Sequence, residues 1–161
     1  MANKIQNFDT GEKDNSNIIH LDLDPKINIE NKIYFKNLLK KIAECSLDNL
    51  EENLENLYHV DAEFNGFHPI NEIKGIEEIK NKYLIPLKKA FPDLERRNNL
   101  VIGGAFRDKV FVSFISHLTG TFKNEWLGVK PTNKTIYLRT CEAHQITNNK
   151  IIKSYTLIDT V

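Results

Sequence analysis

The sequence predicts an α+β domain in which three N-terminal helices pack on a curved antiparallel sheet and enclose a pocket with it. Two observations indicate this fold class. Apolar residues recur at helical spacing before Phe91, and after Leu94 they alternate with polar residues as they do in strands. Helices that precede a run of consecutive antiparallel strands are typical of α+β folds.

The N-terminal segment, residues 1–30, is predicted to be a mobile tail in front of one folded domain at 31–161. Residues 1–17 are polar, rich in Asn, Asp and Lys, and show no periodicity. The segment IIHLDLD at 18–24 could form a short strand or an extended piece packed on the body, and Pro25 is expected to end it. The length of 161 residues fits one domain preceded by such a tail.

Three helices are predicted before Phe91. The first begins near Asn31, the second can be capped by Ser46, and the third follows Gly75. Pro86 lies inside the third pattern and should kink that helix or end it early. The apolar stripes are Phe35, Leu38, Leu39, Ile42 and Ala43 in the first helix, Leu47, Leu50, Leu54 and Leu57 in the second, and Ile76, Ile79, Tyr83, Leu84 and Leu87 in the third.

Four strands are predicted in the second half of the chain. They span 94–106, 109–122, 135–147 and 150–159. A loop at 123–134 joins the second and third strands, and Asn148-Asn149 is a hairpin turn of the primed type. The pair Gly103-Gly104 suggests a bulge. The earlier stretch AEFNGFHP at 62–69 is expected to be irregular or briefly extended, because a glycine and a proline interrupt it.

The balance of charge argues against nucleic acid or an anionic membrane as a partner. The chain has 22 basic and 22 acidic residues, whereas such partners require a basic surface. No apolar run approaches the roughly 20 residues that span a bilayer, and the N-terminus has no hydrophobic signal sequence, so we expect a cytoplasmic protein. Cys45 and Cys141 have no neighbours at metal-ligand spacing, so we expect reduced thiols and no metal site.

The third predicted strand carries the strongest candidates for acid–base chemistry. Alternation places Thr140, Glu142 and His144 on one face. If this face lines the pocket, desolvation would push Glu142 toward its neutral form, while a charged His144 would oppose that change. The pair could then act as general acid and base. If the face is exposed, both are ordinary surface groups.

The last strand is expected to form one wall of the pocket. One of its faces carries Ile152, Ser154, Thr156 and Ile158, and the other carries Ile151, Lys153, Tyr155, Leu157 and Asp159. Asp159 is either a solvated strand-end acid or a partner for a nearby cation. His68, held extended by the proline after it, could reach across the pocket mouth or lie at the surface. Trp126 could close the pocket or anchor its loop.

Three segments, taken together, resemble the SnoaL-like polyketide cyclases of the nuclear transport factor 2-like superfamily. They are AFPDL at 90–94, LGVKPT at 127–132, and the ending NKI…LID at 149–159. The resemblance covers residues 31–161. It implies a cone-shaped α+β fold with an enclosed pocket, usually dimeric. It also implies a cofactor-free intramolecular aldol closure of a polyketide ester, driven by an acid–base aspartate and an adjacent histidine.

The sequence departs from this family pattern at the aspartate. Counting from the Lys and Ile at 150–151, the family's catalytic aspartate falls on Thr156 and the histidine two residues before it falls on Ser154. The histidine of the preceding strand falls on Glu142. An unaided threonine hydroxyl is not a base near neutral pH. The family mechanism therefore does not carry over intact.

The resulting hypothesis is a cofactor-independent cyclase, isomerase or lyase that acts on a small apolar carbonyl compound. Glu142 would be the base, with His144 or His68 as its proton partner. The substrate-binding candidates are Trp126, Thr156, Ser154 and Thr140. Two alternatives stay open: a non-catalytic ligand-binding domain on the same fold, and an association module whose sheet pairs with another protein. A homodimer through the outer sheet face is expected, because Tyr155 and Leu157 point away from the pocket.

Overall fold

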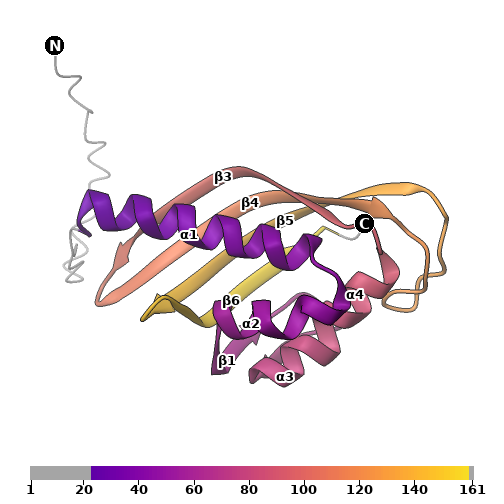
Figure 1. Ribbon diagram of the computed structural model, residues 1–161, viewed down its shortest axis with the longest axis horizontal. Helices are drawn as coiled ribbons and strands as arrows, with labels where there is room; N and C mark the ends of the chain where they lie inside the picture. Colours follow the sequence, from indigo (N-terminus) through magenta and orange to yellow (C-terminus); the bar gives the residue numbers. More distant parts are fainter. Residues whose placement is uncertain (1–22, 160–161) are drawn as a thin grey trace, which may run out of the picture.

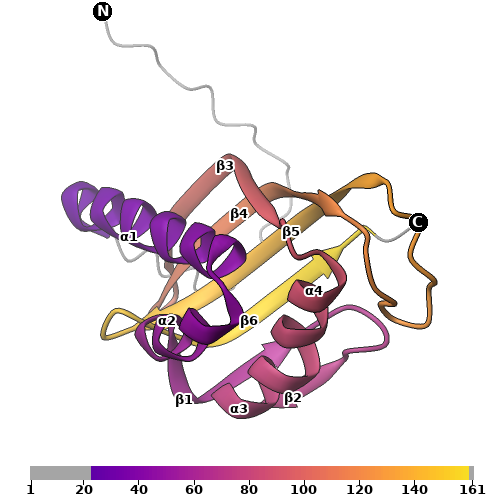
Figure 2. The same cartoon turned by 45° about the vertical axis from the view of Figure 1, so that its right-hand side comes forward.

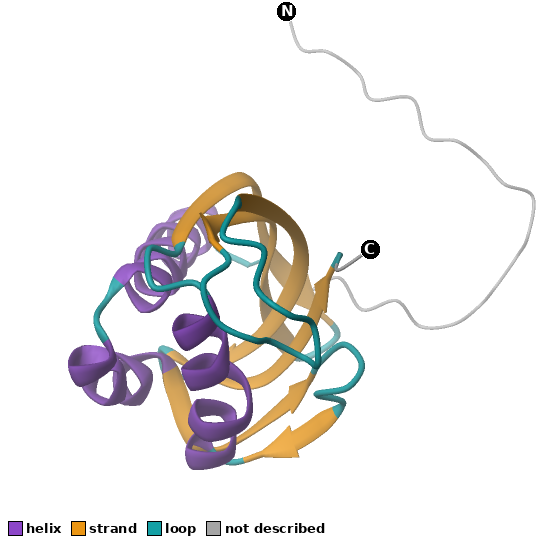
Figure 3. Ribbon diagram, turned by 90° about the vertical axis from the view of Figure 1, so that its right-hand side faces the viewer, coloured by secondary structure: helices purple, strands orange, loops and turns teal. Residues whose placement is uncertain are grey.

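The computed structural model describes residues 23–159 and confirms the α+β fold. The elements are α1 (Pro25–Glu44), η1 (Leu47–Asn49), α2 (Leu50–Leu57), β1 (Tyr58–Asn65), β2 (Glu72–Lys74), α3 (Ile76–Ile79), η2 (Lys80–Leu84), α4 (Ile85–Ala90), β3 (Glu95–Phe106), β4 (Lys109–Thr121), β5 (Thr135–Thr147) and β6 (Lys150–Ile158). The strands form one sheet in the order β2-β1-β6-β5-β4-β3. Figure 3 shows the sheet curving around the helices, which all lie on its concave side.

The helices divide the concave face between them. α1 runs along β3, while α2 and α3 pack on β1 (Figures 1 and 2). Residues 1–22 of the tail predicted at 1–30 lie outside the described residues, whereas residues 25–30 belong to α1, so the folded domain begins earlier than the predicted boundary at 31. No helix within residues 23–159 is long and apolar enough to cross a membrane.

The first helix starts earlier than the sequence pattern predicted. It begins at Pro25 rather than near Asn31, and the Asp24 carboxylate accepts hydrogen bonds from the backbone N–H groups of Lys26 and Ile27 at 2.7 and 3.2 Å. A proline in the first turn has no N–H to lose and is already held at a helical φ. Pro25 therefore starts the helix. The predicted stripe is confirmed, because Phe35, Leu39 and Ile42 are buried.

The other two predicted helices are confirmed with changes at their ends. Ser46 precedes a 3₁₀ turn and makes no side-chain cap, so α2 begins only at Leu50. Pro86 does not end the third helix, which continues to Ala90. A π-helical turn at Lys80–Leu84 comes just before this proline. In a regular α-helix the ring of Pro86 would clash with a backbone carbonyl of the preceding turn. The wider π-helical turn relieves this clash.

The sheet contains strands that the sequence pattern did not predict. The stretch at 62–69, expected to be irregular or briefly extended, is extended at 62–65, where it belongs to β1, an eight-residue strand that pairs in parallel with β6 and antiparallel with β2. The sheet is therefore not wholly antiparallel. The four later strands match the prediction to within a residue at each end. Asn148 and Asn149 both have positive φ, 50° and 58°, which confirms the primed turn.

The prediction of a bulge at Gly103-Gly104 is wrong. These glycines pair regularly with β4, and the register of β3 shifts instead between Asn98 and Leu100. Gly103 allows α1 to pack closely on β3. The Asn28 side chain of α1 donates a hydrogen bond to the carbonyl oxygen of Gly103 at 3.0 Å. A Cβ on Gly103 would lie 2.2 Å from Asn28 Oδ1.

A second register shift corrects the predicted faces of β6. It lies where Gln145 and Ile146 of β5 pair with Lys153 and Ile151. Across this shift β6 advances by two residues and β5 by one, which is a β-bulge in β6. Ile151 therefore faces the core and Ile152 does not. After the shift, Ser154, Thr156 and Ile158 face inward, as predicted.

Candidate functional site

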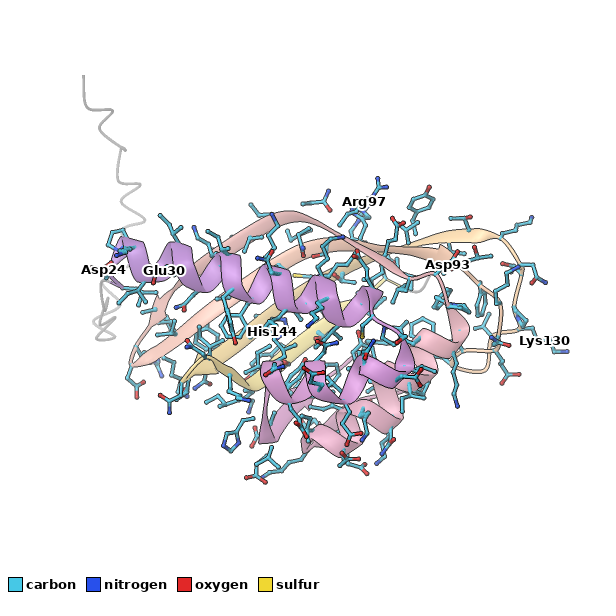
Figure 4. The ribbon with its side chains drawn as sticks, viewed as in Figure 1. Asp24, Glu30, Asp93, Arg97, Lys130 and His144 are labelled. Atoms are coloured by element: carbon cyan, nitrogen blue, oxygen red, sulfur yellow. The ribbon has the colours of Figure 1, made fainter. Side chains whose placement is uncertain are left out.

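The concave face of the sheet holds a buried polar network centred on Glu142. The alternation predicted for β5 is confirmed, and Thr140, Glu142 and His144 all point inward and are buried. This burial excludes the alternative in which they are ordinary surface groups. Figure 4 shows His144 between α1 and the sheet, well separated from Asp93 near the opposite end of the molecule.

Both oxygens of the Glu142 carboxylate have hydrogen-bond partners. Oε1 accepts hydrogen bonds from Arg96 Nη1 at 2.8 Å and from Thr140 Oγ1 at 2.7 Å. Oε2 lies 3.2 Å from His144 Nε2. Because an ionised carboxylate can only accept, Nε2 carries a proton and donates it to this contact.

Arg96 decides the charge state of this network. Burial by itself would raise the pKa of Glu142, but the guanidinium of Arg96 and the hydrogen bond from His144 outweigh burial, and the pKa is well below its usual range. Desolvation and His144 thus act on the pKa of Glu142 in the directions expected from the sequence, and Arg96, which was not expected, determines the net result. Glu142 stays ionised, and a carboxylate with a lowered pKa is a weak base.

Sequence reasoning missed Arg96, although its position in β3 offered a signal. It alternates with Leu94 and so shares the inward face of the strand. Its Nε donates to Asn98 Oδ1 at 2.9 Å and its Nη2 to Ser116 Oγ at 3.0 Å. The guanidinium carbon also lies 5.5 Å from the ring centroid of Phe114. These contacts give the buried cation several partners besides Glu142, as a desolvated charge requires.

The network continues through His144 to the first strand. His144 Nδ1 lies 2.8 Å from Ser154 Oγ, and this oxygen lies 3.5 Å from the hydroxyl of Tyr58. The serine hydroxyl can pair with Nδ1 in either role, because it both donates and accepts. Burial raises the pKa of Tyr58 to about 12, so its phenol stays protonated near neutral pH.

The pairing of β5 with β6 places this network next to Thr156, the position at which the sequence comparison expected the family's acid. Glu142 lies opposite Thr156, and His144 lies opposite Ser154. A carboxylate and an imidazole two residues apart thus occupy β5, directly across from the two positions of β6 where the family pattern has an aspartate and a histidine. Thr156 and Ser154 are buried on the same face.

An apolar cavity of about 310 Å³ lies at the other end of β5, beneath the loop after β4. Its lining residues are His68, Pro69, Phe91, Phe122, Trp126, Leu127, Val129, Ile136 and Leu138. Leu138 and Glu142 share one face of β5, about 13 Å apart along the strand at 3.3 Å per residue. The structure therefore does not bring His68 together with Glu142 and His144.

Two motifs singled out in the sequence build the walls of this cavity. In the first, the Asp93 carboxylate accepts hydrogen bonds from the backbone N–H and the hydroxyl of Thr121, both at 2.6 Å. This contact ties the segment that contains Phe91 to the end of β4. In the second, Trp126 and Val129 exchange backbone hydrogen bonds across Leu127 and Gly128, whose φ angles are 53° and 79°.

That second turn explains the LG pair of the motif. Two consecutive positive φ angles define a primed turn, and glycine adopts such a φ at little cost. A Cβ on Gly128 would meet nothing within 4 Å, so its backbone angle, and not crowding, favours glycine there. The Trp126 side chain lies in the cavity wall, and its two expected roles, closing the pocket or anchoring the loop, both stay predictions.

Nothing in the described part of the chain forms a metal centre. Residues 23–159 hold no group of three or more His, Cys, Asp or Glu side chains arranged around a common point. Within the same residues, Cys45 and Cys141 are both free thiols.

Comparison with known proteins identifies the family and the fold. The family model for SnoaL-like polyketide cyclases matches residues 36–161. A proposed SnoaL-like polyketide cyclase from Jannaschia sp. CCS1 is similar in structure, with 16% identity, a TM-score of 0.65, and 86% of this chain and 90% of that chain covered. No curated protein matches the sequence.

Two proteins from Streptomyces are also similar in structure. AclR, a proposed hydroxylase from Streptomyces galilaeus, has 20% identity and a TM-score of 0.64, with 82% of this chain and 90% of that chain covered. IdmH, a proposed polyketide cyclase from Streptomyces antibioticus, has 17% identity and a TM-score of 0.57, with 77% and 91% covered. Identities this low establish the shared fold and leave the activity to be argued from the site.

Proposed function

The chain belongs to the SnoaL-like polyketide cyclase family, and we propose that it performs cofactor-independent acid–base chemistry on a small apolar carbonyl compound in the cavity. The reaction class is cyclisation, isomerisation or dehydration, each of which begins with removal of a proton next to a carbonyl. The observation that supports this proposal is that His68 is the one titratable side chain among the described residues that line the cavity.

His68 is the proposed base. It is exposed at the cavity mouth, and the unprotonated nitrogen of a neutral imidazole can accept a proton. Removal of a proton from the carbon next to the carbonyl leaves the C–H electron pair in an enolate, whose negative charge rests on the oxygen. An apolar cavity strengthens any hydrogen bond to that oxygen, because little water competes for it.

For Glu142 and His144 we propose a positioning role in place of the catalytic role expected from the sequence. Both side chains are buried, neither lines the cavity, and Arg96 keeps the carboxylate ionised and weakly basic. Their network holds β3, β4, β5 and β6 in fixed register, since its members come from all four strands. Thr140, Ser154 and Thr156 then belong to the same support, and Trp126 remains the substrate-binding candidate that lines the cavity.

Hydrogen–deuterium exchange tests this assignment. 1-Tetralone in D₂O exchanges the protons next to its carbonyl, and NMR follows the loss of their signal. We expect the wild-type protein to accelerate this exchange and His68→Gln to abolish most of the acceleration, because a positioned general base contributes about 10²–10⁴-fold.

Two further histidines provide matched controls. His144→Gln removes the buried imidazole and His117→Gln removes one on the outer side of β4, where it contacts Asn99. Both should retain the acceleration while folded. If His144→Gln loses the exchange and His68→Gln keeps it, the base lies in the buried network and the assignment to His68 is wrong.

A second candidate function is non-catalytic binding of the same class of ligand. The observation that favours it is the exposure of His68: no hydrogen bond within residues 23–159 orients the imidazole of this side chain. This function predicts saturable binding of 1-tetralone with an exchange rate equal to that of the free ketone. The exchange assay therefore separates the two functions.

We also propose that the protein is a homodimer through the outer face of the sheet. Large apolar side chains are exposed on the convex side of three neighbouring strands. They are Ile115 of β4, Tyr137 of β5, and Tyr155 and Leu157 of β6. Exposed apolar side chains gathered on one face of a small domain are typical of an association site, and a twofold axis would cover them with a second copy.

A further inference from the structure

The turn that carries His68 is closed on itself. This His68 turn, residues 66–71, joins β1 to the three-residue strand β2. Three hydrogen bonds lie within it. They run from Gly66 N–H to Asn71 O at 2.8 Å, from Asn71 N–H to Phe67 O at 3.0 Å, and from Asn71 Nδ2 to Pro69 O at 3.1 Å. These internal bonds hold the shape of the turn without help from its surroundings.

One aromatic side chain attaches the His68 turn to the wall of the cavity. Within residues 23–159, no hydrogen bond joins the turn to a residue outside it. Phe67 is buried, and its ring centroid lies 6.2 Å from that of Tyr83 and 6.0 Å from that of Trp126. The interplanar angles are 77° and 61°, an edge-to-face arrangement that aromatic rings prefer. Packing of Phe67 therefore does the work that hydrogen bonds do elsewhere in the fold.

The opposite wall of the cavity is fastened by hydrogen bonds. The loop after β4, which carries Trp126, contacts the last carbonyl groups of α4. Ala90 O accepts a hydrogen bond from Lys123 N–H at 2.8 Å, and Lys89 O accepts one from Asn124 Nδ2 at 2.6 Å. These carbonyls end a helix and have no partner within it, so the loop satisfies them. Of the two walls, the His68 turn is the one that can move without breaking hydrogen bonds to its neighbours.

We propose that Phe67 is a positioning residue for His68, because its ring holds the turn against Trp126 and so fixes where the imidazole lies at the cavity mouth. This inference rests on the proposed role of His68 as the base. Phe67 is not among the residues that line the cavity, so it acts through its neighbour in the chain and not on the ligand. A general base must lie within hydrogen-bond reach of the proton that it removes.

Displacement of the turn should affect proton removal more than binding. Most of the lining belongs to the other walls, including Phe91, Phe122 and Leu138, so a ligand keeps most of its contacts when the turn moves. The base, in contrast, leaves its place, and a displacement of about 1 Å can cost about 100-fold in rate. Loss of the Phe67 ring should therefore lower kcat and leave KM almost unchanged.

The exchange of 1-tetralone protons in D₂O tests this separation of the two constants. Phe67→Leu keeps an apolar side chain and removes the ring contacts. We expect its kcat to fall by about 10- to 100-fold while its KM stays within about twofold of the wild-type value. Phe122→Leu is the matched control on the opposite wall, since it removes a ring that lines the cavity. It should raise KM by a larger factor than it lowers kcat.

Motion of the turn can also be measured without a ligand and without a variant. Backbone ¹⁵N relaxation dispersion reports motion on the microsecond-to-millisecond timescale. In the wild-type protein we expect dispersion at His68 and Asn71 and none at Lys123 and Asn124. Phe67→Leu should increase the dispersion at the first pair of residues and leave the second pair unchanged.

Three results would overturn the inference. They are a wild-type kcat in Phe67→Leu, a rise in its KM as large as the fall in its kcat, and dispersion at Lys123 and Asn124 as strong as in the His68 turn. A wild-type protein that does not accelerate the exchange would instead reject His68 as the base. The dispersion measurement would then still decide whether Phe67 holds the turn, so the two failures are distinguishable.

Discussion

Substitution of Arg96 by methionine should destabilise the protein strongly at neutral pH. The side chains of Arg96 and Glu142 are each 5% exposed and their charged atoms lie 2.8 Å apart. Arg96→Met preserves much of the apolar stem and leaves the Glu142 carboxylate buried without its cation. Removal of one partner from a buried ion pair costs about 3–5 kcal/mol. For a domain of this size that loss corresponds to a fall in Tm of roughly 6–20 °C.

The pH dependence gives this prediction a sign. In the wild type the folded pKa of Glu142 lies below the value of about 4.3 for an unfolded Glu, so the pair stabilises the fold above that pH, and the contribution is lost as the pH falls through the folded pKa. Without Arg96, burial should raise the pKa of Glu142. The loss in Arg96→Met should therefore be largest near pH 7 and smaller near pH 4.

Urea unfolding, followed by circular dichroism at both pH values, measures the effect. Arg97→Met is the matched control, because Arg97 is the next residue, is 77% exposed, and lies 3.8 Å from Glu95 (Figure 4); it should change the free energy of unfolding by less than about 0.5 kcal/mol. The double variant Arg96→Met with Glu142→Gln should be more stable than Arg96→Met alone, since it no longer buries an unpaired charge. If Arg96→Met unfolds like the wild type at pH 7, Glu142 does not depend on this cation and the reasoning fails.

Two other predictions concern the sheet. Leu157 is 64% exposed on the proposed dimer face, so Leu157→Glu should convert a dimer into a monomer in light scattering at micromolar concentration, and a wild-type monomer would contradict the proposal. Gly103→Ala should lower the free energy of unfolding by about 1–3 kcal/mol, because its Cβ would overlap Asn28. Gly104→Ala, with nothing within 4 Å of its Cβ, should cost less, and equal losses in urea unfolding would show that the packing of α1 on β3 is not the cause.

The sequence predicted best what depends on local patterns. The stripe that begins at Phe35 lies within one helix, and the turn at Asn148-Asn149 needs two residues that tolerate positive φ. The inward face of β5 follows from strict alternation over thirteen residues. In each case the residues that determine the structure are neighbours in the chain, so a short window contains the whole signal.

The errors arose where the determining partner is distant in sequence. The length of β1 was underestimated because its partner β6 comes some ninety residues later, and parallel pairing leaves no hairpin signal between two strands. The effect of Arg96 on Glu142 was missed for the same reason: Arg96 lies 46 residues away, and only the curved sheet brings the two together. The start of α1 was placed too late because the Asp24 cap, and not the apolar stripe, determines where the helix begins.

The absence of the family's aspartate at Thr156 follows from the presence of Glu142. Residues directly opposite in an antiparallel pair have Cα atoms about 4.5–5.5 Å apart, so an aspartate at 156 would place a second carboxylate beside Glu142 in a buried site. Two such carboxylates do not ionise together, and Arg96 has a single positive charge to share between them. A neutral Thr156 avoids that conflict. A carboxylate and an imidazole lie instead one strand away, on β5, where Arg96 pairs with the carboxylate. Because that pairing lowers the basicity of Glu142, the proposed function places acid–base chemistry outside this network, in the cavity lined by His68 and Trp126.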